Sequence, residues 1–254
     1  MSKFITEAEL IKRAPVVATE GNGPKASDKY VHVSTIDVVR DLEKLGWKPT
    51  KAFQLNSWSK NKKGYQKHMI IFENPDIVQD KNYIPEIVLT NSHDAKCSFR
   101  LEAGLFDKLV SERFLICTED FGSLRIRHIH YSFDQLRAAV NSLVALVPDL
   151  HEKVKLAKKT TISDIQKNRL LEQAVNIRFN PNRNYVYDIT NSFLVPTNSI
   201  WDIFRAIQNS LIDGGVHYTN EKGQKKETKE IKSFHRAMKI RRAIWELIIS
   251  KNYM

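Results

Sequence analysis

Three short segments rich in β-branched and aromatic residues follow one another early in the chain, and they limit the folds that it can adopt. They are KPTKAFQLNSW at 48–58, KHMIIFEN at 67–74 and EIVLTN at 86–91, with polar turns between them. Segments of this length and composition are typical of strands that pair with their neighbours in the chain. We therefore expect an antiparallel β-meander, with two further strands at 113–119 and 123–131.

An amphipathic helix is expected just before the meander. IDVVRDLEKLGW at 36–47 places apolar side chains at helical spacing, and Ser34 or Thr35 can cap its start. Gly46 can end it. The preceding YVHVST at 30–35 alternates as a short strand does.

The chain becomes helical after the strands. Serine and glutamine three residues apart form capping-box patterns that begin at Ser132 and Ser163. Pro148 is expected to end the first helix, because proline cannot donate a backbone hydrogen bond. The expected elements are helices at 132–147, 149–159, 163–177, 199–212 and 231–249, and a loop at 179–191. The predicted class is α+β, with a helix followed by an antiparallel β-meander and then a mostly helical C-terminal half.

The domain organisation is expected to be simple. Residues 1–28 have little periodicity and run into the linker-like GNGPKASDK, so they predict a flexible N-terminal arm. We expect an α+β core at 29–131 and a helical part at 132–254 that packs on it, as one compact domain.

The composition favours a polyanionic partner. The 254 residues include 40 Lys and Arg against 29 Asp and Glu, a formal charge of +11. A generically soluble basic protein is the alternative. Two cysteines, Cys97 and Cys117, are too few for a disulfide framework, and we expect both to be reduced thiols. The sequence shows neither a secretion signal nor eighteen consecutive apolar residues, so we expect a protein of the bacterial cytoplasm without a membrane partner.

The positive charge is concentrated in three regions, and the first of them is 44–67. This segment holds seven lysines and no acid, interleaved with Trp47, Phe53, Trp58 and Tyr65. Lysines for phosphates and rings for bases are what a groove for single-stranded nucleic acid needs. The alternative places Trp47 and Phe53 in the core, whereas Trp58 lies in a polar loop where burial is harder to arrange.

Two further basic regions are expected to extend this surface. In 217–242, five cations at steps of four and three would line one face of the last helix if that helix begins early. In 123–131, strand alternation puts Arg125 and Arg127 on one face. The residues predicted to contact nucleic acid are Lys51, Trp58, Lys60, Lys62, Lys63, Tyr65, Lys67, Arg125, Arg127, Lys225, Lys229, Lys232, Arg236 and Lys239.

The stretch TNSHDAKC at 90–97 carries the side chains of a catalytic cluster. Consecutive residues such as Ser92, His93 and Asp94 splay apart, however, so they cannot meet as nucleophile and base. The turn-forming residues of this stretch favour a hairpin tip. Asn91, His93 and Asp94 remain a candidate loop site, with no catalytic residue assigned.

Enzymatic alternatives have weaker support. Glycine-rich phosphate loops are absent, and His128 with His130 would need further ligands to hold zinc. Glu73, Asp76 and Glu86 leave a metal-dependent nuclease open, since acids on strands can hold Mg²⁺ and activate water. We expect no cofactor, no bound metal and no enzyme activity.

Long stretches of the chain resemble a known family. KHMIIFEN, PEIVLTNSHDAKCSFRLEAGLF, FGSLRIRH and the region from IWDIFRAIQ to RAIWEL are similar to phage and plasmid proteins grouped as domain of unknown function 932. The resemblance covers most of 28–250, and family members usually carry Gly where Ala95 stands. It implies the context of a mobile genetic element, in which DNA is the expected partner.

A second resemblance concerns the helix and the start of the meander. TIDVVRDLEKLGWKPTKAFQLN resembles the core of single-strand annealing proteins, which build a basic groove in oligomeric rings. RLEAGLFDKLVSERF has fewer lysines than the helix that follows the sheet in those proteins.

The expected function is binding and annealing of single-stranded DNA in recombination. The expected partners are single-stranded DNA, host or phage proteins, and further copies of the chain in a homo-oligomer. Two alternatives stay open: an anti-defence or host-factor interaction protein, and the metal-dependent nuclease.

Overall fold

The structure is a computed structural model that divides into two compact units. Unit 1 comprises Met1–Phe114 and Glu119–Pro148, and unit 2 comprises Leu115–Thr118 and Asp149–Met254. The chain passes between the two units after Phe114, Thr118 and Pro148, and the expected division of one compact domain near position 131 stays a prediction. The structure describes residues 4–21, 23, 32–55, 64–77, 83–94, 99–107, 113–117, 132–179 and 182–250.

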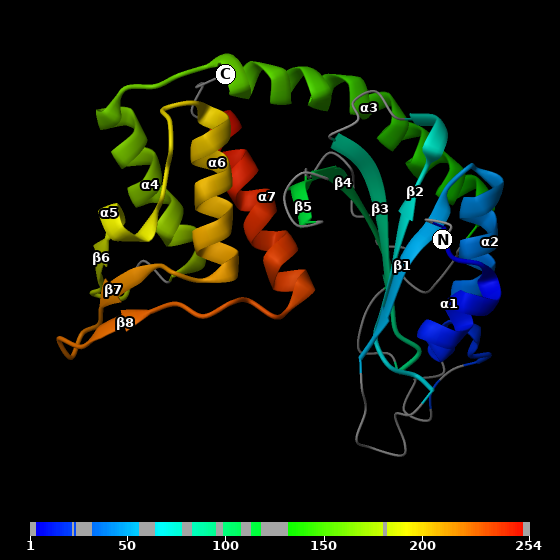
Figure 1. Ribbon diagram of the computed structural model, residues 1–254. Helices are drawn as coiled ribbons and strands as arrows, with labels where there is room; N and C mark the ends of the chain where they lie inside the picture. Colours follow the sequence, from blue (N-terminus) through cyan, green and yellow to red (C-terminus); the bar gives the residue numbers. More distant parts are fainter. Residues whose placement is uncertain are drawn as a thin grey trace. The chain divides into compact units, whose positions relative to one another are not determined.

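Unit 1 is built on the expected antiparallel meander (Figure 1). Hydrogen-bonded neighbours in the sheet are also neighbours in the chain, and the order is β1-β2-β3-β4-β5. The strands are β1 (Lys48–Gln54), β2 (His68–Glu73), β3 (Tyr83–Asn91), β4 (Arg100–Asp107) and β5 (Arg113–Cys117), the last of which belongs to unit 2 from Leu115 onward. Ile70, Phe72 and Leu89 supply buried apolar side chains to this sheet. The strand expected at 123–131 lies outside the described residues.

Helix α2 (Thr35–Lys44) precedes the meander and starts and ends as predicted. The Ser34 hydroxyl accepts a hydrogen bond from the Asp37 amide at 3.3 Å, and Gly46 takes a positive φ of 86° just after the helix. Residues 32–34 are not a strand, because α2 begins where the alternating pattern was expected to continue.

Residues 4–21 of the segment that the sequence predicts to be a flexible arm are folded. They form helix α1 (Glu7–Arg13) and the 3₁₀ turn η1 (Pro15–Ala18), and the Ile5 amide donates to the Pro49 carbonyl of β1 at 2.9 Å. Leu10 is fully buried. The amphipathic pattern covers only two turns, which is too short to stand out from sequence alone.

The cap at the start of α1 can be tested by substitution. The Thr6 hydroxyl accepts from the Glu9 amide while the Glu9 carboxylate accepts from the Thr6 amide, a complete capping box. Thr6→Ala should lower the free energy of unfolding by about 1 kcal/mol, and Thr6→Ser should preserve it, because only the hydroxyl caps. Thermal unfolding of both variants measures this, and equal losses in the two would contradict the capping role.

Helix α3 (Phe133–Lys159) runs through Pro148, which corrects the expected break. Its start is as predicted, since the Gln135 amide donates to the Ser132 hydroxyl at 3.2 Å. Proline removes one backbone hydrogen bond, but the helix continues because Val147 and Leu150, on either side of it, are buried.

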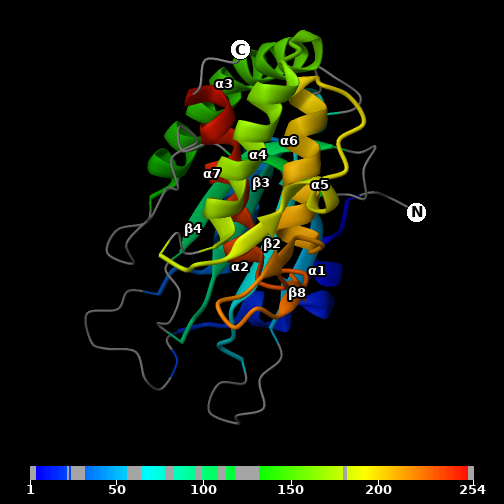
Figure 2. The same ribbon diagram turned by 90° about the vertical axis from the view of Figure 1, so that its left-hand side faces the viewer.

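Unit 2 consists of helices with a small sheet at one end. Helices α4, α6 and α7 lie side by side in both views (Figure 1 and Figure 2), and Leu170, Phe204 and Trp245 are buried within them. The elements are α4 (Asp164–Arg178), β6 (Val186–Asp188), α5 (Ile189–Ser192), α6 (Ile200–Gln208), the π turn η5 (Asn209–Asp213), β7 (His217–Thr219), β8 (Lys225–Glu227) and α7 (Phe234–Ser250). The expected loop at 179–191 thus contains β6 and α5, whose three and four residues are too few to show a period.

Candidate nucleic-acid interface

The three short strands of unit 2 form an antiparallel sheet in the order β6-β7-β8. Its register aligns Tyr187, Tyr218 and Lys226 in one row across the sheet. The flanking rows are Asp188, His217 and Glu227 on one side, and Val186, Thr219 and Lys225 on the other. Because successive side chains of a strand point to opposite faces, the tyrosine row lies on one face and both flanking rows lie on the other.

A tight turn fixes the β7–β8 hairpin. The Asn220 side-chain oxygen accepts from the Lys222 and Gln224 amides, each at 3.0 Å, and the Gly223 amide donates to the Asn220 carbonyl at 2.9 Å. Gly223 has a φ of 72°, which glycine adopts without strain. This turn connects the strands next to their last pair, Thr219 and Lys225.

Four aromatic rings gather on the tyrosine face. The Phe179 centroid lies 5.9, 5.0 and 5.2 Å from those of Tyr185, Tyr187 and Tyr218, and the Tyr185 and Tyr218 centroids are 5.1 Å apart. All four rings are half-buried, so part of each remains accessible. Burial raises the pKa of the Tyr187 hydroxyl, with smaller contributions from Tyr185 and Tyr218, so the ring stays neutral. We call these four residues the aromatic face.

An arginine ties this face to the rest of unit 2. The Arg178 guanidinium donates to the Leu211 carbonyl of η5 at 2.6 Å and to the Lys229 carbonyl just after β8. Burial lowers its pKa, and the nearby charge of Arg236 adds to that effect. The segment that leaves the hairpin is therefore held by a half-buried cation.

The lysines of the second basic region do not share a helix face, which corrects the expectation for 217–242. Helix α7 begins only at Phe234, where the Ser233 hydroxyl accepts from the Arg236 amide at 3.4 Å. Lys225 lies in β8, and Lys229 and Lys232 lie in the extended segment between β8 and α7. Pairing with β7 takes up the residues that would have formed an early helical turn. Arg236 and Lys239 are exposed on α7.

These cations are nevertheless concentrated and free. Lys225, Lys226, Lys229 and Lys232 are exposed, and none forms an ion pair with another residue that the structure describes. Like charges so close together repel one another, and a polyanion relieves that repulsion.

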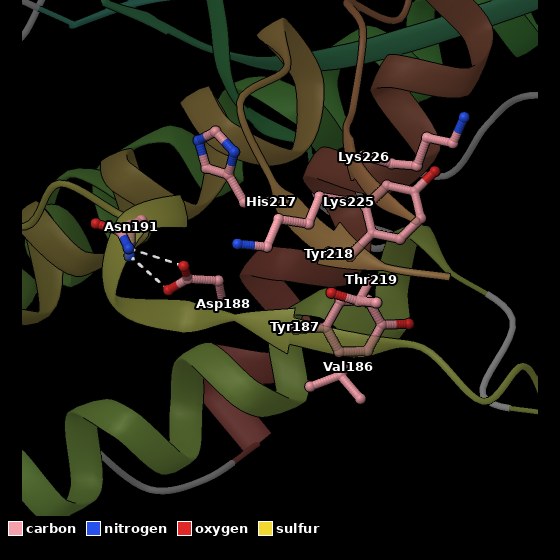
Figure 3. Close-up of a pocket in the computed structure, with 9 residues that line it drawn as sticks. All are labelled: Val186, Tyr187, Asp188, Asn191, His217, Tyr218, Thr219, Lys225 and Lys226. Carbon is pink, nitrogen blue, oxygen red and sulfur yellow. Dashed lines mark hydrogen bonds between the residues drawn. The ribbon is translucent and has the colours of Figure 1, made fainter. Parts of the chain in front are cut away.

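A pocket lies at the small sheet and takes side chains from both of its faces. The pocket has a volume of about 750 Å³ and is lined by Val186, Tyr187, Asp188, Asn191, His217, Tyr218, Thr219, Lys225 and Lys226. Figure 3 shows the Asp188 carboxylate, the His217 ring and the Lys225 ammonium gathered together, with the Tyr187 and Tyr218 rings beyond them. The Asn191 amides, side-chain and backbone, donate to both Asp188 oxygens, at 2.7 and 3.1 Å. These two bonds are the main reason that the pKa of Asp188 is lowered, and the charges of His217 and Lys225 contribute less.

The first basic region is only partly described. Lys51 of β1, Tyr65 and Lys67 are half-buried. Trp47 is fully buried, as the core alternative required, but Phe53 is 49% exposed, so the core assignment is wrong for that ring. Trp58, Lys60, Lys62, Lys63, Arg125 and Arg127 lie outside the described residues.

The candidate loop site at the end of β3 turns inward. Asn91 and His93 are fully buried, and Asp94 is half-buried. The Asn91 amide donates to the Thr35 hydroxyl at 3.0 Å and to the Val33 carbonyl at 3.2 Å. The expected β3–β4 hairpin is present, but its first polar side chains pack inside unit 1 and do not line an exposed loop.

A histidine that sequence reasoning missed completes this buried polar cluster. His68 lies opposite Asn91 in the sheet register, and its ring centroid is 5.2 Å from that of His93. Its Nδ1 lies 3.0 Å from the Gln66 carbonyl, which can only accept, so Nδ1 carries the proton in the neutral ring. Nε2 therefore accepts from the Thr35 hydroxyl at 2.8 Å. Burial lowers the pKa of His68 to about 4.

The acids of the nuclease alternative are partly brought together. Glu73 and Glu86 lie directly opposite each other on β2 and β3, and both are buried, whereas Asp76 is exposed. No group of three or more His, Cys, Asp or Glu that can hold a metal occurs among the described residues.

The comparisons with known proteins agree with one another. A family model described as Domain of unknown function (DUF932) matches residues 25–245. The UPF0380 proteins YafZ and YfjQ of Escherichia coli (strain K12) are each 26% identical over 247 residues, which cover 95% of this chain and 89% of the relative. No solved structure matches the chain. In the part of the chain that the structure describes, no helix is long and apolar enough to cross a membrane.

Proposed function

This chain belongs to the family described as Domain of unknown function (DUF932), and we propose that it binds single-stranded DNA through the small sheet of unit 2. The binding surface consists of the aromatic face together with Lys226 and Lys229. Annealing of complementary strands in the recombination of a mobile genetic element is the activity that such binding would serve.

One observation carries this proposal: the row of Tyr187, Tyr218 and Lys226 across the sheet. Accessible rings side by side on a sheet offer the flat surfaces on which successive bases stack, whatever their sequence. A lysine in the same row lies where the phosphate between two stacked bases would pass. Side chains directly opposite in a sheet have Cβ atoms about 5 Å apart, which is close enough for both contacts to involve one nucleotide.

The charge around this row supports the same proposal. Residues 217–242 contain nine Lys and Arg against three Glu, a net charge of +6 out of +11 for the whole chain. Each phosphate that these cations neutralise would release counterions, so the affinity should fall steeply as salt rises. Neutral rings and free lysines are the two components of a surface that binds single strands without sequence preference.

The test compares variants of the row in the full-length protein. Lys226→Glu should weaken the binding of a labelled single-stranded oligonucleotide at least about tenfold and reduce the slope of log affinity against log salt by about one. Tyr218→Ala should weaken binding by about 1–3 kcal/mol, and Tyr218→Phe should retain most of the affinity because stacking needs the ring and not the hydroxyl.

The matched control reverses a lysine far along the chain from the sheet. Lys153→Glu on α3 makes the same change of net charge at a residue that pairs with Asp149, and it should leave binding nearly unchanged. Losses as large in Lys153→Glu as in Lys226→Glu would show that only net charge matters. Salt-independent affinity, or tighter binding of duplex DNA or RNA than of single-stranded DNA, would also contradict the proposal. Parallel incubation with Mg²⁺ tests strand cleavage, which this proposal does not expect.

A further inference from the structure

The pocket at the same sheet has charged and polar side chains on its lining. Its side chains come from three strands and one helix: Asp188 from β6, Asn191 from α5, His217 and Thr219 from β7, and Lys225 from β8 (Figure 3). A volume of about 750 Å³ is ample for a ligand of nucleotide size.

The pocket offers opposite charges at separate points. The Asp188 carboxylate is oriented by two hydrogen bonds from Asn191, and each of its oxygens keeps lone pairs for a ligand donor. The Lys225 ammonium is exposed and makes no ion pair within the described residues. A ligand that fits both must carry an anion and a hydrogen-bond donor a few ångströms apart.

The remaining side chains of the pocket provide further hydrogen-bond donors and an apolar surface. The half-buried His217 ring, opposite Asp188 in the register, and the half-buried Thr219 hydroxyl, opposite Lys225, can each donate to anionic oxygens. Val186 is 72% exposed and provides an apolar surface within the same pocket. An anion, a polar donor and a flat apolar part occur together in a phosphorylated nucleoside.

We propose that this pocket binds a nucleoside monophosphate, either free or as the phosphorylated end of a strand. Lys225 and Thr219 hold the phosphate with His217, Asp188 accepts from a sugar hydroxyl or base amino group, and Val186 contacts the base. Tyr187, Tyr218 and Lys226 also line the pocket. The proposal is nevertheless distinct from strand binding, because its charged contacts come from Asp188, His217 and Lys225, and it stands even if the aromatic face binds no DNA.

Isothermal titration calorimetry of the full-length protein with AMP, adenosine and inorganic phosphate tests it. AMP should bind at least about tenfold more tightly than either adenosine or phosphate, since both halves of the pocket contribute. Lys225→Gln should weaken AMP binding about tenfold, because a charge-assisted hydrogen bond to phosphate is lost. Lys222→Gln removes the same charge from the turn of the same hairpin, outside the pocket lining, and should have little effect.

Two oligonucleotides that differ only in a 5′-phosphate distinguish the sources of the ligand. If the phosphorylated oligonucleotide loses affinity in Lys225→Gln and the unphosphorylated one does not, the ligand is a strand end; loss for AMP alone identifies a free nucleotide. Absence of AMP binding, equal binding of AMP and adenosine, or equal losses in Lys225→Gln and Lys222→Gln would overturn the proposal. These outcomes are measured with Lys225→Gln and Lys222→Gln and need no substitution of Lys226 or Tyr218, so the proposal for the aromatic face is judged separately.

Discussion

Lowering the pH from 7 to 5 should reduce the free energy of unfolding of unit 1 by about 2 kcal/mol through His68 alone. The ring is buried among the Thr35 hydroxyl, the Gln66 carbonyl and the Asn91 side chain, and its pKa is lowered from 6.5 to about 4. The neutral ring satisfies both of its nitrogens there. A second proton on Nε2 would face a Thr35 oxygen that already accepts from Asn91.

The direction follows from proton binding in the two states. Between pH 6.5 and 4 the unfolded chain holds a proton on His68 that the folded chain excludes, so acid favours unfolding. The stabilising contribution is complete above about pH 6.5 and is lost progressively as the pH falls towards 4. The full change amounts to about 3 kcal/mol, which is a large share of the stability of a typical domain.

Hydrogen exchange of the β2 and β3 amides in the full-length protein measures this loss. His68→Gln serves as the comparison: it should be less stable at pH 7 but should show a shallower dependence on pH, because it has no group to titrate. Should that variant fail to fold, the ring signals of His68 in the wild-type NMR spectrum decide instead. A His68 that titrates near 6.5, or equal pH slopes in the two proteins, would contradict the prediction.

The meander of unit 1 could be predicted from sequence because each strand carries its own signal. HMIIFE and EIVLTN are long and apolar enough to identify β2 and β3, and Ser34 and Gly46 mark the ends of α2. The polar cluster could not be predicted, because it depends on register. His68 meets Asn91 only in the alignment that the strands adopt, and a shift of one residue would turn His68 outward.

The sheet of unit 2 could not be predicted from the sequence, for a different reason. Its strands have three residues each, and Tyr187 and Tyr218 lie 31 positions apart in the chain. A three-residue strand has no measurable period, so the sequence predicts a loop around Tyr187, and it places the lysines after Gln224 on a helix face only if the last helix begins early. The basic charge of the region was visible in the sequence, whereas the rings beside it became apparent only from the pairing of β6 with β7.

Gly214→Ala should be the most damaging single substitution near this sheet, with a loss of at least about 3 kcal/mol in the free energy of unfolding. Gly214 has a φ of 105°, and an added Cβ would lie 2.6 Å from the Thr228 carbonyl oxygen and 3.1 Å from the Lys229 carbonyl carbon. Both contacts are backbone atoms, so no side chain can rotate away. The chain after β8 would have to move, breaking the hydrogen bonds that join Thr228 to Gly215 and Val216.

A substitution of the neighbouring Gly215 separates the backbone strain in this loss from the steric clash. Gly215 has a similar φ of 101°, but nothing lies within 4 Å of an added Cβ. Gly215→Ala should therefore lower the free energy of unfolding by only about 1–2 kcal/mol, the cost of a positive φ in a residue with a Cβ. Gly214→Ala should lower it further, because its Cβ would also clash with the backbone of 228–230. Hydrogen exchange of the β7 and β8 amides in both variants provides the measurement, and single-strand affinity should fall in the same order. Equal effects at the two positions would mean that the close approach of Gly214 to Thr228 does not hold the hairpin in place.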